Sequence, residues 1–426
     1  MTASIELSIE GLSRIGSDPS RNLRVDLERR VSTSHPPSRD AFPEFSTMLQ
    51  DQVLAPSRAP ALVKKFVVHS DQLKSAARAI SLPSRSSGVI AMTLSADALR
   101  LSESTSDNGF SVATTVDLIR SNLADNETIG FEIQKKVLAS WSHHYDCELS
   151  FELDKDEDGL AWKGSARSFH IRTPVRFVDA TAGTEEPRRL AEVNARALYD
   201  AIGYAALLIE KRTTGTQAFD GLQISGGGAR SGYLGGVSLY RSAALPNDLS
   251  CILPKRNVSN ALVAIGKMQG AVAIAETDDA VFINSGSTEL FWTKAGRFRP
   301  FDGIFDTVMA ATFNVVVAEA LRIATIARIA SDRGRIVLQA SDSDHSLLLL
   351  SISPTSRYEG TLKGELRECS LPPASSLELN VDLADLHRVL LSIRTPDAEI
   401  SISKHRLIVK SACADYVETS ALAAVQ

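Results

Sequence analysis

The fold is decided by Ile252-Leu-Pro-Lys-Arg-Asn-Val-Ser-Asn-Ala-Leu-Val-Ala-Ile265 and by Val272-Ala-Ile-Ala-Glu-Thr-Asp-Asp-Ala-Val-Phe-Ile283, which follows shortly after. The first stretch predicts a helix over 255–268, because it follows Pro254 and its apolar residues recur three and four positions apart. The second predicts two short strands joined by a polar Thr-Asp-Asp turn. The local pattern is therefore a helix followed by antiparallel strands.

The same pattern recurs along the chain at a nearly constant interval. Helices are predicted to start near residues 71, 134, 194, 255, 313 and 382, at spacings of 58 to 69 residues. Their predicted ranges are 71–80, 134–144, 194–212, 255–268, 313–328 and 382–393. Short β-branched or alternating runs, bounded by Gly, Asp, Asn and Ser, lie between them. The sequence thus predicts a repeat of one helix followed by three or four antiparallel strands, used six times.

Two repeats per domain give the predicted domain organisation. We expect an α+β fold with three tandem two-helix domains at 63–185, 186–307 and 308–426. Residues 1–62 are rich in Pro and Ser and have no sustained period, so they are expected to form a flexible extension. A small structured domain in 1–62 is the alternative.

Composition limits the class of protein. The hydrophobic content of 44% is typical of a globular chain, and no apolar run is long enough for a membrane helix. No secretory signal is visible at the start, and the four cysteines are far apart in the sequence. We therefore expect a cytoplasmic protein without a membrane partner or a disulfide framework. The net charge of −5, from 46 basic and 51 acidic residues, at first argues against a nucleic-acid partner.

Motifs of catalysis and of metal or cofactor binding are missing. His143-His144 lies at a predicted helix end without metal-ligand spacing, and Asp154–Asp158 lacks the ligand pattern of a calcium loop. The glycine-rich run Ser225–Gly236 has no Gly-Lys-Ser/Thr ending and no helix directly after it, so a hairpin or flexible loop is favoured over a phosphate site. We expect no catalytic residue, no metal and no cofactor. An enzyme that uses the Ser225–Gly236 loop as a ligand site is the alternative.

Charge is unevenly distributed between the predicted helices and the rest of the chain. Counted over 71–80, 134–144, 194–212, 254–268, 313–328 and 382–394, the six helices carry a net charge of +8, so the remaining residues carry −13. Basic residues concentrated on one repeated element predict a surface that binds phosphates without sequence preference. Basic and aromatic residues are not interleaved, which favours duplex over single-stranded DNA.

Three stretches resemble one family. The region from Ile252 to Ile283 and its continuation Ser287-Thr-Glu-Leu-Phe-Trp-Thr-Lys-Ala-Gly-Arg-Phe298 resemble the second domain of the bacterial DNA polymerase III β subunit, the sliding clamp. Phe66-Val-Val-His-Ser-Asp-Gln-Leu73 resembles the opening strand and helix of that clamp. The resemblance spans about 66–426 and agrees with the six-fold repeat.

The resemblance implies a non-enzymatic, ring-forming clamp fold. In this family two three-domain protomers associate head to tail, and their helices line a hole around duplex DNA. Residues that would face DNA are Lys74, Arg78, Arg85, Lys135, Lys136, Arg196, Lys211, Arg212, Lys255, Arg256, Lys267, Arg322 and Arg328. The homodimer contact would involve Phe169, Ile171 and Ile326, for which domain core is the alternative.

The family also has a pocket that accepts short hydrophobic peptides from polymerases and the clamp loader. Residues that would line it are Phe219, Gly236, Val237, Leu239, Pro300, Ile304, Val417, Thr419 and Leu422. The family's Thr-Asp-Gly-His-Arg-Leu piece aligns with Leu234–Leu239, where Val237 and Ser238 replace the His-Arg pair. The usual C-terminal run is also replaced, by Glu418-Thr-Ser-Ala-Leu-Ala-Ala-Val-Gln426.

The sequence therefore predicts a sliding clamp that encircles duplex DNA and tethers a replicative polymerase. The altered pocket and C-terminal end favour an alternative, which is a clamp-like accessory binding protein of plasmid or phage type with changed partner specificity.

Overall fold

The computed structural model describes residues 63–141, 146–154, 159–164, 167–178, 187–209, 221–233, 235–294, 304–305, 308–340, 345–352, 356–372 and 375–425. The predicted extension 1–62 lies outside these residues, as do His143-His144 and most of the acidic stretch 154–158. We call 63–178 the first segment, 187–294 the second segment and 308–425 the third segment. Within the described residues, no helix is both long enough and apolar enough to cross a membrane.

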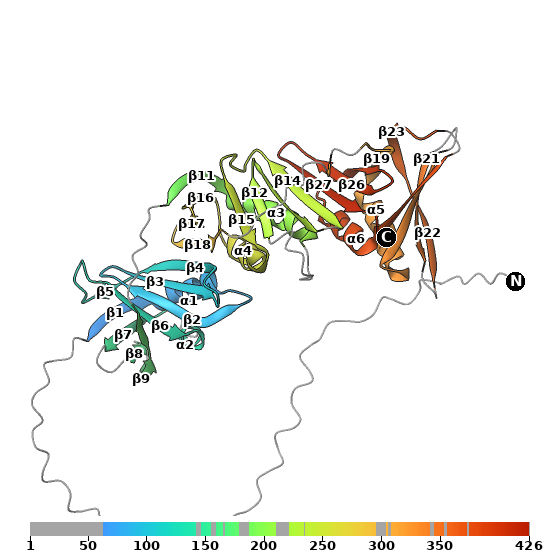
Figure 1. Cartoon of the computed structure of the whole chain (residues 1–426). Helices are drawn as coiled ribbons and strands as arrows, with labels where there is room; N and C mark the ends of the chain where they lie inside the picture. Colours follow the sequence, from blue (N-terminus) through green and yellow to red (C-terminus); the bar gives the residue numbers. More distant parts are fainter. Residues whose placement is uncertain are drawn as a thin grey trace, which may run out of the picture. The chain divides into compact units, whose positions relative to one another are not determined.

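All six predicted helices are confirmed (Figure 1). They are α1 (Ser70–Ile80), α2 (Lys135–Trp141), α3 (Ala195–Ala205), α4 (Val258–Ile265), α5 (Val317–Ala330) and α6 (Leu383–Ser392). Two short 3-10 turns, η1 (Ala206–Leu208) and η2 (Lys255–Asn257), occupy the end of the third predicted helix and the start of the fourth. The prediction was wrong over 313–316, which pairs on both sides as the end of a strand instead of starting α5.

Side-chain caps fix the starts of three helices. His69 Nδ1 accepts a hydrogen bond from the amide of Asp71 at α1, and Asn194 accepts one from Arg196 at α3. Asp382 accepts from two amides at the start of α6. These contacts satisfy backbone donors that have no partner within the helix.

Four sheets contain the described strands. The five-stranded sheet has the order β5 (Arg120–Ser121), β1 (Lys64–His69), β7 (Glu148–Asp154), β8 (Gly159–Gly164) and β9 (Arg167–Pro174). The four-stranded sheet has the order β22 (Arg357–Leu362), β21 (His345–Ile352), β20 (Arg333–Ala340) and β24 (Ser376–Asp382).

The other two sheets have nine strands each. The first has the order β10 (Arg176–Val178), β6 (Ile129–Gln134), β2 (Ser86–Leu94), β3 (Ala98–Thr105), β4 (Phe110–Asp117), β18 (Thr288–Thr293), β17 (Ala280–Ser285), β16 (Ala271–Glu276) and β11 (Arg188–Asn194). The second has the order β15 (Ser250–Pro254), β12 (Gly221–Ser225), β13 (Gly228–Tyr233), β14 (Gly236–Ser242), β27 (Tyr416–Ala423), β26 (Arg406–Ala412), β25 (Asp397–Ile402), β19 (Ala311–Val316) and β23 (Gly364–Cys369).

A single rule relates helices and strands. Each helix is followed by three antiparallel strands that pair in sequence order, as β2, β3 and β4 follow α1. The strand that enters each helix pairs instead with the strands of the other helix in the same segment, as β1 pairs with β7 and β6 pairs with β2. The predicted unit of one helix and three or four antiparallel strands is therefore confirmed.

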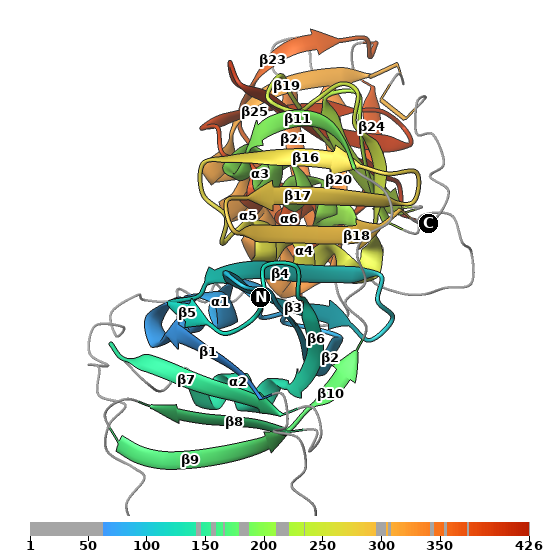
Figure 2. The same ribbon diagram turned by 90° about the vertical axis from the view of Figure 1, so that its left-hand side faces the viewer.

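Two strand pairings join the segments into continuous sheets. β4 of the first segment pairs with β18 of the second, with Val112 opposite Leu290 (Figure 2). β14 of the second segment pairs with β27 of the third, with Ser238 opposite Ser420. Each junction joins the last strand of one three-strand run to the last strand of another.

Within its described residues, the glycine-rich run lies in two antiparallel hairpins, β12–β13 and β13–β14, as the sequence favoured. Gly226 and Gly227 make the turn between β12 and β13, both with positive φ. A side chain at Gly227 would meet Asn247 Oδ1 at 2.8 Å, so the turn is closed against the adjacent loop.

Buried apolar residues form two clusters beneath the helices. One runs through the first and second segments and includes Phe66, Trp141 and Trp292. The other fills the third segment, and Leu208 from η1 of the second segment is part of it. The helices thus cover the face of the sheets that carries these buried apolar side chains.

Candidate nucleic-acid interface and the two sheet junctions

The basic residues predicted to face DNA fall into groups with different surroundings. Arg78, Arg85, Lys136 and Arg322 are exposed and make no ion pair with another described residue. Lys74 and Lys255 are partly buried. Lys211 and Arg212 lie outside the described residues. The first group therefore offers charges that are free of acidic partners within the described part of the chain.

Four other predicted residues are paired with acids. Lys135 Nζ lies 2.6 Å from Glu103 Oε1, and Arg256 lies 2.8 Å from Asp107. Arg196 lies 3.1 Å from Asp200. Arg328 lies 3.9 Å from Asp332 and 3.2 Å from His387 Nδ1. Of these acids, Glu103 is fully buried, so the charge of Lys135 is committed to the interior of the first segment.

Lys267 closes the end of a helix. Its ammonium donates to the carbonyls of Arg78 at 2.7 Å and of Ser81 at 3.1 Å, at the C-terminus of α1. A cation at this end of a helix interacts favourably with the helix dipole. Burial lowers the pKa of the Lys267 ammonium. Its contacts join the second segment to the first beside the β4·β18 junction.

Buried asparagines from α4 and η2 reinforce the same junction. Asn257 Nδ2 donates to the carbonyl of Gly109 at 3.2 Å, and Asn260 exchanges hydrogen bonds with the backbone of Ser84. Both asparagine side chains are fully buried. The Pro-Lys-Arg-Asn-Val-Ser-Asn stretch that starts at Pro254 thus docks α4 onto the first segment.

The β14·β27 junction divides the predicted peptide-pocket residues between its two faces. Val237, Leu239, Val417 and Thr419 alternate onto one face. Gly236 and Leu422 lie on the opposite face, toward the helices, where Leu422 belongs to the core of the third segment.

The remaining pocket residues are only partly described. Phe219 and Pro300 lie outside the described residues. Ile304 is described, and its carbonyl accepts a 2.8 Å hydrogen bond from Arg406. Four of the described pocket residues therefore share one face of the junction. We call these three apolar side chains and Thr419 the apolar strip, in which Val237 is buried.

A polar cluster lies on the helix side of this junction. Tyr204 of α3 hydrogen-bonds to Ser420 of β27 at 3.0 Å, and Ser420 lies 3.2 Å from Ser238 of β14. Asp200 of α3 pairs with Arg394, just beyond α6, at 2.5 Å. These contacts come from both segments, so they fasten the helices across the junction.

Glu418 stands out within this cluster. Its side chain is fully buried, and neither carboxylate oxygen has a hydrogen-bond partner among the described residues. Burial raises the pKa of Glu418 to about 7, although the Arg394 guanidinium lowers it in part. The neighbouring Tyr240 and Tyr416 rings stack with centroids 5.5 Å apart. A carboxyl group in this state contributes an electrostatic cost once it ionises.

The sheet edges bear on the predicted dimer contact. Phe169 and Ile171 lie in β9, the last strand of the five-stranded sheet. Ile326 of α5 is partly buried, whereas Ile329, three residues later, is 82% exposed. α5 packs against β21 and β22, so Ile329 stands at the end of a helix that covers the four-stranded sheet. The exposed apolar side chain at this place was missed from the sequence.

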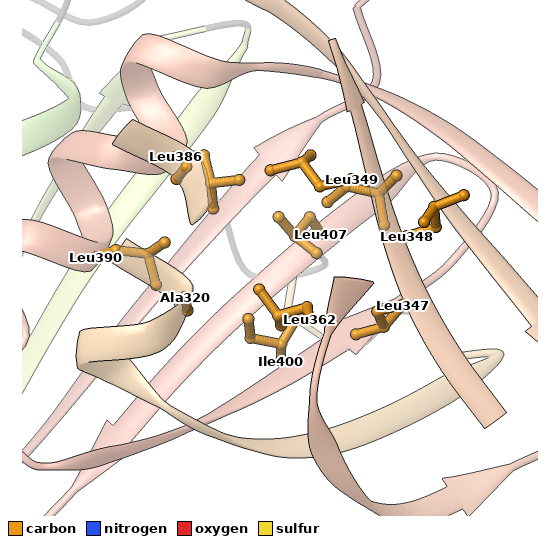
Figure 3. A pocket seen from close by; sticks show the side chains of 11 residues that line it. Ala320, Leu347, Leu348, Leu349, Leu362, Leu386, Leu390, Ile400 and Leu407 are labelled. Carbon is orange, nitrogen blue, oxygen red and sulfur yellow. The ribbon is translucent and has the colours of Figure 1, made fainter. Parts of the chain in front are cut away.

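One apolar cavity lies in the core of the third segment. It holds about 20 Å³ and is lined only by Ala, Leu and Ile side chains (Figure 3). Leu347, Leu349, Leu386, Leu390 and Leu407 are among them. The cavity has no titratable group that could take part in acid–base chemistry.

One cluster has a residue composition suited to a metal ion. His69, Asp71 and Asp146 place their ligand atoms within 4.8 Å of one another. However, His69 Nδ1 accepts a hydrogen bond from the amide of Asp71, so the neutral ring carries its proton on Nε2, which faces Asp146 at 3.8 Å. This arrangement suits a helix cap better than a metal ligand.

Solved structures of bacterial sliding clamps share the fold described above. The clamp of Pseudomonas aeruginosa has a TM-score of 0.69 at 13% identity, over 85% of this chain and 100% of that chain. The β subunit of Caulobacter crescentus has a TM-score of 0.68 at 13% identity, with coverage of 85% and 100%. The Helicobacter pylori β clamp, bound to a DNA ligase peptide, has a TM-score of 0.65 at 16% identity, again with coverage of 85% and 100%.

These likenesses establish the fold. The chain has the mixed, mostly antiparallel clamp fold of these bacterial DNA polymerase III β subunits, at 13–16% sequence identity. No protein-family model matches the sequence, and no curated protein matches it.

Proposed function

We propose that the protein is a non-catalytic DNA sliding clamp, in which two copies form a ring around duplex DNA. The observation that carries this proposal is the arrangement of the sheets. Inside the chain, the last strands of four three-strand runs pair at the two junctions, and each junction completes a nine-stranded sheet. The last strands of the other two runs, β9 and β22, are edges of the five-stranded and four-stranded sheets.

A second copy supplies the missing pairing. By the rule of the two internal junctions, β9 of one copy pairs with β22 of the next and makes another nine-stranded sheet. Such pairing also covers two edge strands that are otherwise open to aggregation. Because β9 belongs to the first segment and β22 to the third, the contact is head to tail, and a head-to-tail contact generates a ring where the rotation between copies closes. We propose that it closes after two copies. On this basis we propose domains at 63–185, 186–307 and 308–426.

The helix faces support duplex binding. Four exposed cations, Arg78, Arg85, Lys136 and Arg322, come from the first and third segments, and Arg256 and Arg196 lie on the second. Cations spread in this way bind phosphates without reading the bases. A ring needs only weak affinity for DNA, since closure holds it on the duplex.

Partner binding is proposed at the apolar strip of the β14·β27 junction. The Helicobacter pylori clamp in the comparison holds a DNA ligase peptide. In this chain Val237 is buried and Ser238 is turned toward Ser420 on the helix side. The strip therefore lacks the polar side chains that the family offers at these two positions, which favours an accessory clamp with altered peptide specificity as the second candidate.

Two experiments test these proposals. The solution mass of the full chain distinguishes a two-copy ring from a monomer, and Ile329→Lys is expected to shift the ring to monomers. A pull-down with the host's polymerase and clamp-loader subunits separates the two candidate functions. Binding to either subunit supports the replicative clamp, and a ring that binds neither supports the accessory clamp.

A further inference from the structure

The loop that follows α1 carries an arginine in an unusual backbone conformation. Arg85 has a φ of 53°, in the left-handed region that non-glycine residues rarely adopt. Its side chain is exposed, and it makes no ion pair with another described residue. A conformation of this kind is strained and persists only where the surroundings hold it.

The residues on both sides of Arg85 are held firmly. Glu103, fully buried in β3, accepts hydrogen bonds from the amide of Leu82 at 3.3 Å and from the hydroxyl of Ser86. The carbonyl of Arg85 itself accepts from the amide of Ser106 at 2.9 Å. The first segment thus fixes both ends of the loop.

The middle of the loop is fixed by the second segment. Asn260 Oδ1 accepts from the amide of Ser84 at 3.3 Å and from its hydroxyl at 3.1 Å, while Asn260 Nδ2 donates to the Ser84 carbonyl at 3.1 Å. Both the amide oxygen and the amide nitrogen of this buried Asn260 side chain therefore hydrogen-bond to Ser84. Residues fixed by these hydrogen bonds alternate with exposed residues along the loop. Leu82, Ser84 and Ser86 are fixed, and Pro83 and Arg85 between them are exposed.

We propose that Asn260 is a positioning residue for duplex binding, which holds the loop so that the Arg85 guanidinium meets a DNA phosphate. The inference rests on the proposed clamp function. Arginine is suited to this role because its planar, permanently charged group forms paired hydrogen bonds with phosphate oxygens. Because Asn260 belongs to the second segment, docking of the second segment on the first also sets the position of a DNA contact in the first.

A double-mutant cycle tests this coupling. The affinity of the full chain for a fluorescent duplex oligonucleotide is measured by anisotropy at several salt concentrations. Arg85→Ala is expected to reduce the salt slope by about 1, the value for one lost phosphate contact. Asn260→Ala is expected to give a similar reduction, and the double variant no further one.

Asn257→Ala is the matched control. It also removes a buried hydrogen bond from the same junction, to the carbonyl of Gly109, but it does not touch the Arg85 loop. It is expected to lower the melting temperature and to leave the salt slope unchanged. If Asn260→Ala does not fold, Asn260→Asp replaces it, since the aspartate retains the acceptor for Ser84 but loses the donor.

The outcomes are distinct. Additive losses in the cycle, an unchanged slope in Asn260→Ala, or an equal slope change in Asn257→Ala would overturn the inference. A wild-type ring whose slope does not respond to Arg85→Ala would overturn it while leaving the clamp function intact. A wild-type chain that does not bind duplex at low salt would overturn the proposed function itself.

Discussion

Glu418→Gln is expected to strengthen the β14·β27 junction at neutral and alkaline pH. Glu418 is fully buried on β27, and neither of its carboxylate oxygens has a hydrogen-bond partner among the described residues. Burial raises its pKa from 4.5 to about 7, against the partial effect of Arg394. Glutamine has nearly the same shape as glutamate but stays neutral at every pH. It therefore avoids the desolvation cost of a buried carboxylate.

The two pKa values set the size and the pH window of the effect. The unfolded chain loses this proton near pH 4.5, whereas the folded chain keeps it until about pH 7. Between these values the folded state binds more protons, so its stability falls as the pH rises. At 1.36 kcal/mol per pKa unit, the cost is about 1 kcal/mol at pH 5 and about 3 kcal/mol at pH 8. The variant avoids this cost.

Hydrogen exchange of peptides from β14 and β27 measures the opening of the junction. Amides of the variant should exchange about 4-fold more slowly than those of the wild type at pH 5, and about 300-fold more slowly at pH 8. Glu368→Gln, at an exposed position on β23, is the control and should change neither rate. Equal ratios at the two pH values, or faster exchange in the variant at pH 8, would refute the reasoning.

Three further substitutions test other parts of the structure. Lys135→Met leaves Glu103 buried without its cation and should lower the free energy of unfolding in urea by about 3 kcal/mol. The control Lys136→Met should lower it by less than about 0.5 kcal/mol, and equal losses would contradict the buried pair. Leu407→Ala enlarges the apolar cavity of the third segment and should lower the free energy of unfolding by about 3 kcal/mol. A loss below about 1 kcal/mol would mean that neighbouring side chains move in to fill the space. Ile329→Lys should yield monomers in light scattering while Thr325→Lys, one turn earlier on α5, retains the ring; the opposite result would place the contact elsewhere.

The helices were predictable because each carries a clear helical period. The error at 313–316 has a physical cause, since the run Phe-Asn-Val-Val fits a helix period and a strand period equally well over four residues. Only its pairing with β25 and β23 decides for the strand. The regular spacing of the helices predicted more of the fold than any single motif did.

The surroundings of the charged residues were less predictable. Glu103 lies 32 positions before Lys135 in the sequence. Their ion pair depends on β2, which pairs with β3 on one side and with β6, the strand that leads into α2, on the other. A signal was present, because Glu103 falls on the same face of its strand as Leu99 and Leu101, both of which are buried. Glu418 could have been found in the same way, from its alternation with Ser420 and Leu422.

The DNA-facing residues illustrate the difference between composition and geometry. Counting charges singled out the helices, but it treated Lys267 and Lys136 alike. The structure commits Lys267 to the carbonyls at the end of α1 and leaves Lys136 exposed. Sequence spacing contains no information on such contacts between distant segments, so these residues stay predictions until they are tested.

The central claim is that two copies close head to tail through β9 and β22. The most direct test is the solution mass of the full chain, measured together with electron-microscopy images of the same sample. We predict twice the mass of the 45.9 kDa chain and a closed annulus with a central hole. A monomer, or an open chain of copies without a hole, would contradict the account.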